Sequence, residues 1–475
     1  MPLVAEATPM LFDSTFRNYL AQRPAAVMMR ATLEHIFAAE AIDELFDRTA
    51  QRQYTEELTF STVVALLEAV VFRRHPSVRS AYTHSTTDIP VSLSSLYEKL
   101  NHTEPGLAEE LVRHTATRLR AVAECWPTEA DPVAGLRLKQ LDGNYLAGTD
   151  RRLGELRGHG AAALPGLALV VRDDRTSLLC DLIACEDAYA QERSLVGRVL
   201  ECVGVGELWV ADRNFAVSAL FEGIALRRSF YVIRYHRGTT LHELTPLSAA
   251  GTASTGTVFE QQVRVGKTTC RSVVVRLDKP TTDGDTEIRL LTNLPVERAS
   301  AATVAEVYRR RWRIEASFLE LTTSLRCEVD TLGYPKAALL GFALAVCACN
   351  ALSVVCMALA HAQAETKADT KVAAVKERWE ASSYAVAVEL RVAYDGLVIN
   401  IPNAVWKMFA LWSASQLADW LVGVARNADR KRYRKSKRGP KKPVERVKAG
   451  PMAAHRSTAR LLAQRTKPPK PAPRP

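Results

Sequence analysis

The nine cysteines of this 475-residue chain include no CxxC pair, and its ten histidines supply no ligand spacing to match them. A zinc module is therefore not expected, because structural zinc sites use closely spaced Cys and His ligands. The first residues, MPLVAEATPMLFDSTF, contain acids and lack a cationic segment ahead of an apolar core. We expect no secretory leader, and we expect the cysteines to be reduced thiols in the cytosol.

Long hydrophobic runs are also scarce. One uncharged run, AALLGFALAVCACNALSVVCMALA at 337–360, is long enough to span a bilayer, and nothing resembling a second span accompanies it. The run is rich in Ala and Cys and contains Asn350 and Ser353. A fully buried core helix is the favoured interpretation, and no membrane association is expected.

The first 425 residues have no excess of positive charge, because they hold 45 basic and 50 acidic side chains. The net charge of +11 comes from 426–475, which has eighteen Lys and Arg against two acids. This basic, Pro-rich tail cannot bury enough apolar surface to fold alone, so we expect it to be disordered. Two interpretations remain open: an arm that binds DNA phosphates without reading sequence, and a solubilising tail.

Apolar residues three and four apart predict a helical domain over 1–125. Within it, VSLSSLYEKLNHTEPGLAEELVRHTATRL predicts two helices joined by a turn near Pro105, with Ser92 capping the first. The first of these helices would present Tyr97 and Lys99 to DNA if the pair is a helix-turn-helix reader. Ordinary helical packing is the alternative.

Strand patterns begin near 135 and run as three strands, helix, strand, helix, strand. A mixed α/β sheet flanked by helices accounts for this order. Residues 237–300 alternate apolar and polar side chains between Gly and Thr turns, which predicts an inserted all-strand subdomain. The predicted divisions are a helical domain (1–125), two parts of an α/β core (126–236 and 301–364) around the strand insertion (237–300), a helical region (365–425) and the tail (426–475).

Two aspartates follow strand patterns. Asp142 lies inside the first strand, in LDGN, where the pattern calls for a core residue, and Asp212 ends the fourth strand, in WVADRNF. Functional side chains of open α/β sheets gather at the carboxyl ends of strands. If the first and fourth strands are neighbours, the two carboxylates face each other. They would then repel unless a divalent cation lies between them, and Mg²⁺ prefers such oxygen ligands.

A third acid lies in YRRRWRIEASFLELT at 308–322, which we expect to be one helix. Tyr308 and Glu315 would share a face, with Arg311 one turn before Glu315. Glu315 would complete the metal site while Arg311 and Tyr308 grip a phosphate, with Arg310 and Trp312 alongside as further DNA contacts. A solvated helix face with an Arg311–Glu315 ion pair is the alternative.

Several other polar residues lie near these motifs or resemble them. Arg213 and Asn214 follow Asp212 directly, and they either contact DNA or cap the next helix. The acids of DLIACEDAYAQER (Asp181, Glu186, Asp187 and Glu192) form a loose cluster that we expect to be mainly helix-capping. Asp173 and Asp174 have the pattern of turn residues.

Together these motifs resemble the DDE transposases of bacterial insertion sequences, in the group named after the type-four element. The resemblance covers about 30–360 and depends on LDGN at Asp142, ADRNF at Asp212 and YRRRWRIEASFLEL at Glu315. That group has a signature of Tyr, Arg, Glu and Lys, matched here by Tyr308, Arg311 and Glu315. Its lysine position is Thr322, and no lysine lies between Lys279 and Lys336.

The resemblance implies a ribonuclease-H-like catalytic core with Asp142, Asp212 and Glu315 as catalytic metal ligands. It implies two Mg²⁺ ions, or Mn²⁺ in their place, and cleavage and joining of DNA by in-line phosphoryl transfer. The implied partners are double-stranded DNA (terminal inverted repeats and target) and a second copy of the chain in a synaptic homodimer. The implied location is the bacterial cytoplasm, at the nucleoid. Thr322 leaves two alternatives open: an impaired DNA-binding descendant, and a metal-dependent nuclease on the same core.

Overall fold

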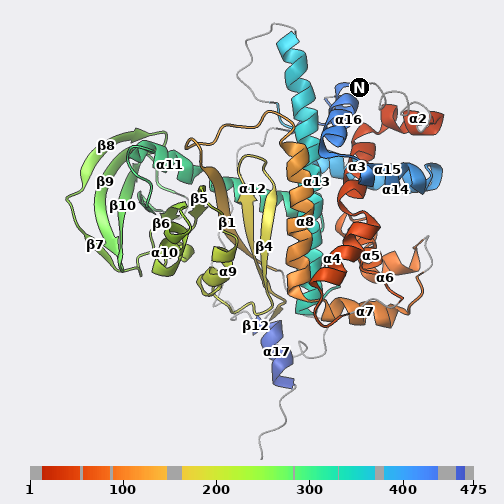
Figure 1. Ribbon diagram of the computed structural model, residues 1–475, viewed down its shortest axis with the longest axis horizontal. Helices are drawn as coiled ribbons and strands as arrows, with labels where there is room; N and C mark the ends of the chain where they lie inside the picture. Colours follow the sequence, from red (N-terminus) through yellow and green to blue (C-terminus); the bar gives the residue numbers. More distant parts are fainter. Residues whose placement is uncertain are drawn as a thin grey trace, which may run out of the picture.

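The computed structural model describes residues 13–53, 57–85, 89–146, 163–281, 284–329, 331–369, 379–429, 431–436 and 456–465. A twisted sheet lies at its centre, with a body of helices on one side and a curved extension of strands on the other (Figure 1).

The helical body combines segments from both ends of the chain. Several of its helices begin at capping residues. The side chains of Thr59, Ser92 and Ser382 each accept a hydrogen bond from a backbone N–H in the first turn of a helix. The predicted cap at Ser92 is thus confirmed. The helices are α2 (Ser14–Gln22), α3 (Pro24–Ile36), α4 (Ala39–Thr49), α5 (Phe60–Val71), α6 (Val78–Thr83), α7 (Leu93–His102), α8 (Pro105–Ala123), α13 (Pro335–Asp369), α14 (Ser383–Asn400), α15 (Asn403–Leu411) and α16 (Ala414–Arg426).

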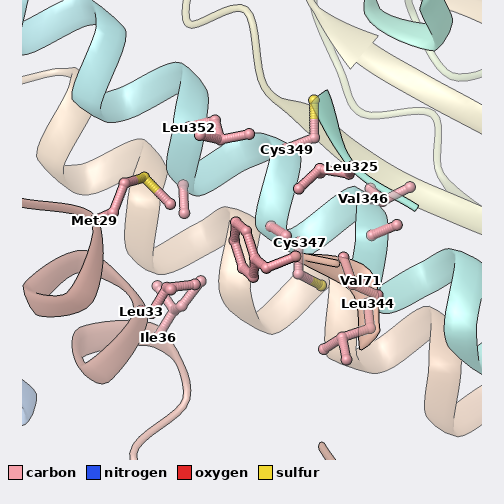
Figure 2. Packing of buried hydrophobic residues seen from close by; sticks show 14 of the residues in the cluster. Met29, Leu33, Ile36, Val71, Leu325, Leu344, Val346, Cys347, Cys349 and Leu352 are labelled. Atoms are coloured by element: carbon pink, nitrogen blue, oxygen red, sulfur yellow. The ribbon is translucent and has the colours of Figure 1, made fainter. Parts of the chain in front are cut away.

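The long helix α13 forms the axis of this body, next to α8 (Figure 1). In the described part of the chain one helix, Pro335–Glu365, is long and apolar enough to cross a membrane, and 83% of its apolar window is buried inside the protein. Neighbouring helices therefore cover this run, as expected for a core helix. Figure 2 shows Met29, Leu33 and Ile36 of α3 and Leu344, Cys347 and Leu352 of α13 as members of the same cluster of buried side chains.

The N-terminal and C-terminal helical regions share this one hydrophobic core. Buried side chains of α3 and α5 and those of α14 and α16 belong to the same cluster around α13. The sequence pattern placed these regions in separate domains, because periodicity identifies an apolar face but not the face that covers it. Amphipathic helices from distant parts of the chain bury one another here.

A histidine in this core makes stability depend on pH. His35 is buried, its Nδ1 lies 3.0 Å from the Phe409 carbonyl oxygen, and burial, with Arg118 nearby, lowers its pKa to about 4. The pKa of His35 in the unfolded chain is about 6.5. The contribution of the neutral ring to the free energy of unfolding is therefore fully present above about pH 6.5 and is lost as the pH falls towards 4.

We expect the free energy of unfolding to fall by about 3 kcal/mol more between about pH 7.5 and pH 4 in wild type than in His35→Asn. The Asn amide can still donate to the Phe409 carbonyl but does not titrate. Urea unfolding at both pH values measures the difference. Equal pH dependence in the two proteins would contradict a buried neutral His35.

The sheet contains ten strands in the order β4-β3-β1-β5-β6-β11-β10-β9-β7, with β8 paired to β9. β5 is parallel to β1 and to β6, whereas β3 is antiparallel to β1 and to β4. The strands are β1 (Arg137–Tyr145), β3 (Leu167–Asp173), β4 (Leu179–Cys185), β5 (Glu207–Ala211), β6 (Phe230–Arg234), β7 (Leu241–Glu243), β8 (Ser248–Ala253), β9 (Gly256–Val265), β10 (Thr268–Leu277) and β11 (Glu287–Thr292).

The all-strand insertion is not a separate sheet. Its last strand, β11, pairs with β6 through Leu290–Arg234 to Thr292–Val232, so its strands continue the central sheet. α9 (Val196–Glu201) and α10 (Ser218–Leu226) cover one face of the sheet, and α11 (Ala301–Arg309) covers the opposite face. The alternation of apolar and polar side chains identifies the two faces of a strand, but it does not tell which sheet the strand joins or at which edge.

The described parts of the basic tail are ordered, contrary to the prediction of disorder. Tyr433 is buried and donates its hydroxyl proton to Glu389 (2.7 Å), which also pairs with Arg432 (2.7 Å). Further on, β12 (Arg456–Ser457) pairs with β2 (Ala163–Leu164), and α17 (Thr458–Arg465) follows. Acidic side chains of the body neutralise the tail in these places. The remaining tail, 437–455 and 466–475, lies outside the described residues.

Candidate active site

Asp142 and Asp212 lie at the same level on neighbouring parallel strands. Leu141 of β1 pairs in register with Ala211 of β5, and each aspartate is the next residue. Because side chains alternate along a strand, both aspartates project to the face opposite Leu141 and Ala211. The predicted adjacency of these two strands is therefore present.

The third acid comes from α12 (Trp312–Ser324), which follows α11 after a break. The expected single helix over 308–322 is wrong: Arg310 and Arg311 form a tight turn in which Arg313 N–H donates to the Arg310 carbonyl (2.9 Å). Gln140 of β1 also donates to that carbonyl (2.8 Å). This contact from the sheet draws the carbonyl out of the helical ladder, which explains the break.

A buried carboxylate fixes the same turn. Asp174 is 4% exposed and accepts hydrogen bonds from Arg172 (3.0 Å), Arg310 (2.8 Å) and Arg313 (3.0 Å). β3 and β4 are antiparallel neighbours, and the chain turns between them at Asp174, as its pattern predicts, but Asp174 is an ion-pair centre rather than a solvated turn residue. Arg310, predicted to contact DNA, is engaged in this cluster.

Arg311 joins two of the three acids. Its guanidinium lies 3.3 Å from an Asp142 carboxylate oxygen and 2.5 Å from a Glu315 oxygen, and the residue is buried. The Arg311–Glu315 ion pair of the alternative interpretation is therefore present, but it is not a solvated surface pair. The guanidinium also lies 5.9 Å from the centre of the Tyr308 ring.

The acids influence one another's protonation. Burial raises the pKa of Asp142 to about 6, opposed by Arg311 and the Gly143 N–H and reinforced by Glu192 and Glu315. Burial also raises the pKa of Tyr308 to about 12, and Asp212 adds to that shift. The charge of Glu315 therefore influences the pKa of Asp142, and the charge of Asp212 influences the pKa of Tyr308.

Within the described residues, no three His, Cys, Asp or Glu side chains are already close enough to hold a metal ion together. Arg311 lies between Asp142 and Glu315, and the Asp212 carboxylate accepts the Arg213 N–H. The donor set, three carboxylates at one sheet face, nevertheless suits a hard divalent cation. Occupation requires the Arg311 guanidinium to leave the carboxylates.

Glu192 is a fourth acid at this site, which the sequence pattern placed in the loose cluster of DLIACEDAYAQER and did not connect with Asp142 or Asp212. It begins a short 3-10 helix (Glu192–Leu195) and is 8% exposed. Its carboxylate accepts from Asn214 (3.0 Å) and lies so close to Gly143 that a Cβ there would be 2.0 Å from Oε1. Glu192 thus contacts both the segment that carries Asp142 and the segment that carries Asp212. In the sequence, the feature that comes closest to indicating this contact is Gly143, a residue without a side chain directly after Asp142.

The remaining candidates differ in their availability. Trp312 is 61% exposed beside the acids, with Arg311 over its ring (5.4 Å). Asn214 is bound to Glu192, whereas Arg213 lines a cavity of about 640 Å³ next to the site, together with Tyr145, Arg193 and His236. The cap of the following 3-10 helix (Arg213–Phe215) is Asp212 itself.

In the predicted DNA-reading helix α7, the geometry favours the packing alternative. The Lys99 ammonium donates to the Leu58 carbonyl (2.7 Å) and lies 4.8 Å from the Phe46 ring centre. Tyr97 is partly buried against the helical core. Both side chains therefore contact the body of the protein.

Thr322, which replaces the expected lysine, is exposed near the end of α12. Its hydroxyl donates to the Leu319 carbonyl (2.9 Å), and its own carbonyl accepts from Arg73 (2.9 Å). A cation from a distant segment, the loop after α5, therefore reaches this position.

Comparison with known proteins finds similarity to transposases. A family model described as Transposase DDE domain matches residues 155–350, which include Asp212 and Glu315 and begin after Asp142. A probable transposase for insertion sequence element IS5377 from Geobacillus stearothermophilus is 30% identical over 149 residues. That match covers 28% of this chain and 38% of the relative, so it spans well under half of the relative's length.

Among solved structures, the piggyBac transposase synaptic complex with hairpin DNA aligns with a TM-score of 0.39 and 10% identity, over 84% of this chain and 85% of that one. This alignment carries no argument for the domain. Residues 155–350 of this chain, less than half of its length, are similar to the transposase DDE domain.

Proposed function

We propose that this chain is a DNA transposase that cleaves the ends of an insertion sequence and joins them to target DNA by metal-dependent phosphoryl transfer. The observation that carries the proposal is the register of β1 and β5, which brings Asp142 level with Asp212 beneath the helix bearing Glu315. The match of 155–350 to a transposase DDE domain supports the same reaction class.

We propose a ribonuclease-H-like core. The strand order β4-β3-β1-β5-β6, with β3 antiparallel and β5 parallel to β1, supports it. The type-four insertion-sequence group is proposed from Tyr308, Arg311 and Glu315, whose types and spacing fit its signature.

Asp142 would hold both of two divalent ions, Mg²⁺ or Mn²⁺, and Asp212 and Glu315 one each. When bound, such ions stabilise the attacking and leaving oxygens of an in-line displacement. Water attacks phosphorus at the element's end, the P–O3′ bond breaks, and a 3′-OH is released. That hydroxyl then attacks phosphorus in the target strand and displaces its 3′ oxygen.

Arg311 has a second role in this proposal. Its guanidinium would exchange Asp142 and Glu315 for a phosphate oxygen of the substrate, a contact for which its planar fork is suited. Glu192 would keep the Asp142 and Asp212 segments together through Asn214 and Gly143. Exposed Trp312 and Arg213 would contact the DNA beside the acids.

The proposed partners are double-stranded DNA, as terminal inverted repeat and as target, and a second copy of the chain, because synapsis of two ends takes two protomers. The proposed location is the bacterial cytoplasm, at the nucleoid. The helices before β1 are proposed to hold the DNA end.

The test is to incubate purified protein and Mg²⁺ with a labelled duplex ending in the inverted repeat that flanks the gene, together with a target plasmid. Covalent joining of the labelled strand to the plasmid is the expected result. A gel shift without cleavage would instead identify a DNA-binding descendant, and cleavage without joining a nuclease. Either outcome would overturn the proposal.

A further inference from the structure

Three arginines from separate segments meet at the end of α12. Arg73 follows α5, Arg326 follows α12, and Arg391 lies in α14. Burial lowers the pKa of Arg391, and repulsion from Arg73 and Arg326 lowers it further. Like charges held together in this way cost free energy, so the cluster calls for a physical reason.

Backbone carbonyls, not carboxylates, hold these guanidinium groups. Arg73 donates to Thr322 (2.9 Å) and Leu325 (2.8 Å), and Arg391 donates to Phe72 (3.1 Å). Arg326 donates to the Pro76 carbonyl (2.5 Å). One Arg391 nitrogen, Nη2, is buried without a hydrogen-bond partner.

Within the part of the chain that the structure describes, no acid neutralises the cluster. Across the described residues no carboxylate lies within ion-pair distance of Arg73, Arg326 or Arg391, whereas the buried arginines 172, 271 and 311 are all paired with acids. A concentrated positive charge without a counter-ion attracts anions.

The backbone at Arg73 has a conformation that costs free energy. Its φ is 59°, in the left-handed region where the residue after a helix is usually Gly. A residue with a Cβ costs about 1 kcal/mol there. From this turn the Arg73 guanidinium reaches the end of α12 and donates to the Thr322 and Leu325 carbonyls.

The exposed side of α12 leads from the acids to this cluster. Trp312, Leu319 and Thr322 are exposed along it, and Glu315 lies between the first two. Glu315 and Ser324, the last residue of α12, are nine residues apart, which corresponds to about 14 Å along a helix, and Arg326 lies two residues beyond the helix end. The phosphates of one DNA strand recur about every 3.4 Å along the duplex axis, so the distance from Glu315 to Arg326 corresponds to about five nucleotides.

We propose that Arg73, Arg326 and Arg391 form a site for a DNA backbone phosphate about five nucleotides from the cleaved bond, on a strand that runs along α12 from Glu315. This proposal rests on the proposed function, because DNA is the polyanion that would lie across these acids.

The first arm of the test measures binding of the inverted-repeat duplex against KCl concentration by fluorescence anisotropy. The variant combines Arg73→Gln, Arg326→Gln and Arg391→Gln, because Gln keeps an amide donor for the carbonyls and loses the charge. The slope of log K against log salt is expected to decrease in magnitude by about one, at about 0.9 for the one phosphate that the site binds. Arg276→Gln, in which the lost charge is paired with Glu287 at 3.7 Å, is the control and should keep the wild-type slope.

The second arm uses wild-type protein, so it does not depend on the folding of a variant. A neutral methylphosphonate is placed at each of the first ten positions from the cleaved bond. Besides the positions at the cleaved bond, where Arg311 is proposed to bind, weaker binding is expected at about positions four to six. The triple variant should lose the sensitivity at positions four to six and keep that at the cleaved bond.

The outcomes separate the two proposals. Wild-type protein that cleaves and joins the repeat, together with unchanged slopes and no sensitive position near the fifth phosphate, would overturn this inference alone. Wild-type protein that neither binds nor cleaves the repeat would overturn the proposed function, and this inference with it.

Discussion

Asp142→Asn is expected to lower the rate of DNA cleavage about a thousandfold or more while leaving binding of the inverted repeat nearly unchanged. The substitution preserves shape and an oxygen for the Gly143 N–H (2.9 Å), and it removes the charge that would hold two cations. Metal ions contribute several kcal/mol of charge stabilisation to such transition states, and each 1.36 kcal/mol is a factor of ten. Single-turnover cleavage of labelled duplex measures the rate.

Asp181→Asn is the matched control for that variant. Asp181 is also an aspartate of the central sheet, on β4, but it pairs with Arg113 (2.8 Å) rather than with the site. Its cleavage rate should stay within a few fold of wild type. A comparable loss in both variants, or full activity in Asp142→Asn, would remove Asp142 from the proposed chemistry.

Asp174→Ala is expected to destabilise the protein by about 3–5 kcal/mol, the usual cost of removing one partner of a buried ion pair. Arg172 is 5% exposed and would lose its carboxylate, and the anchor of Arg310 and Arg313 would be lost as well. Thermal or urea unfolding measures the loss.

The effect of Asp174 should also reach the active site, because its partners fix the turn between Tyr308 and Glu315. We therefore expect the folded Asp174→Ala protein to cleave DNA more slowly at a temperature well below its melting point. Glu380→Ala, which breaks an exposed pair with Lys435 (2.8 Å), is the control and should cost under about 1 kcal/mol. Equal destabilisation by both variants would contradict the central role of Asp174.

The two aspartates were predictable because their signals are local. An acid inside an apolar strand and another at the end of a strand indicate a sheet-edge site whatever the rest of the fold does. The two aspartates are adjacent only if β1 and β5 are neighbours, and the register of Leu141 with Ala211 shows that they are. The helical character of both ends and the burial of α13 followed from periodicity in the same way.

The break at Arg310 was not predictable, because every residue of YRRRWRIEASFLELT is compatible with a helix. Gln140 and Asp174, both distant in sequence, cause it. Local propensity gives way to tertiary contacts at such points. Asp174 was itself misread, since a turn pattern does not reveal whether the turn is buried among arginines.

Glu192 and Tyr433 illustrate the same limit on prediction. Each is unremarkable in its own segment and becomes important through a distant partner: Asn214 for Glu192, and Glu389 for Tyr433. Composition predicted disorder for the tail because it counts charges without regard to the acids that the folded body offers them. Pairwise placement across the chain is the information that one sequence lacks.

The most direct measurement is anomalous diffraction from crystals of the protein bound to its DNA end and soaked in Mn²⁺. We expect manganese at carboxylate oxygens of Asp142, Asp212 and Glu315, at the short distances of about 2.0–2.2 Å typical of small hard cations, with the Arg311 guanidinium moved onto a phosphate. Manganese bound with any one of the three acids outside its coordination shell would contradict the account.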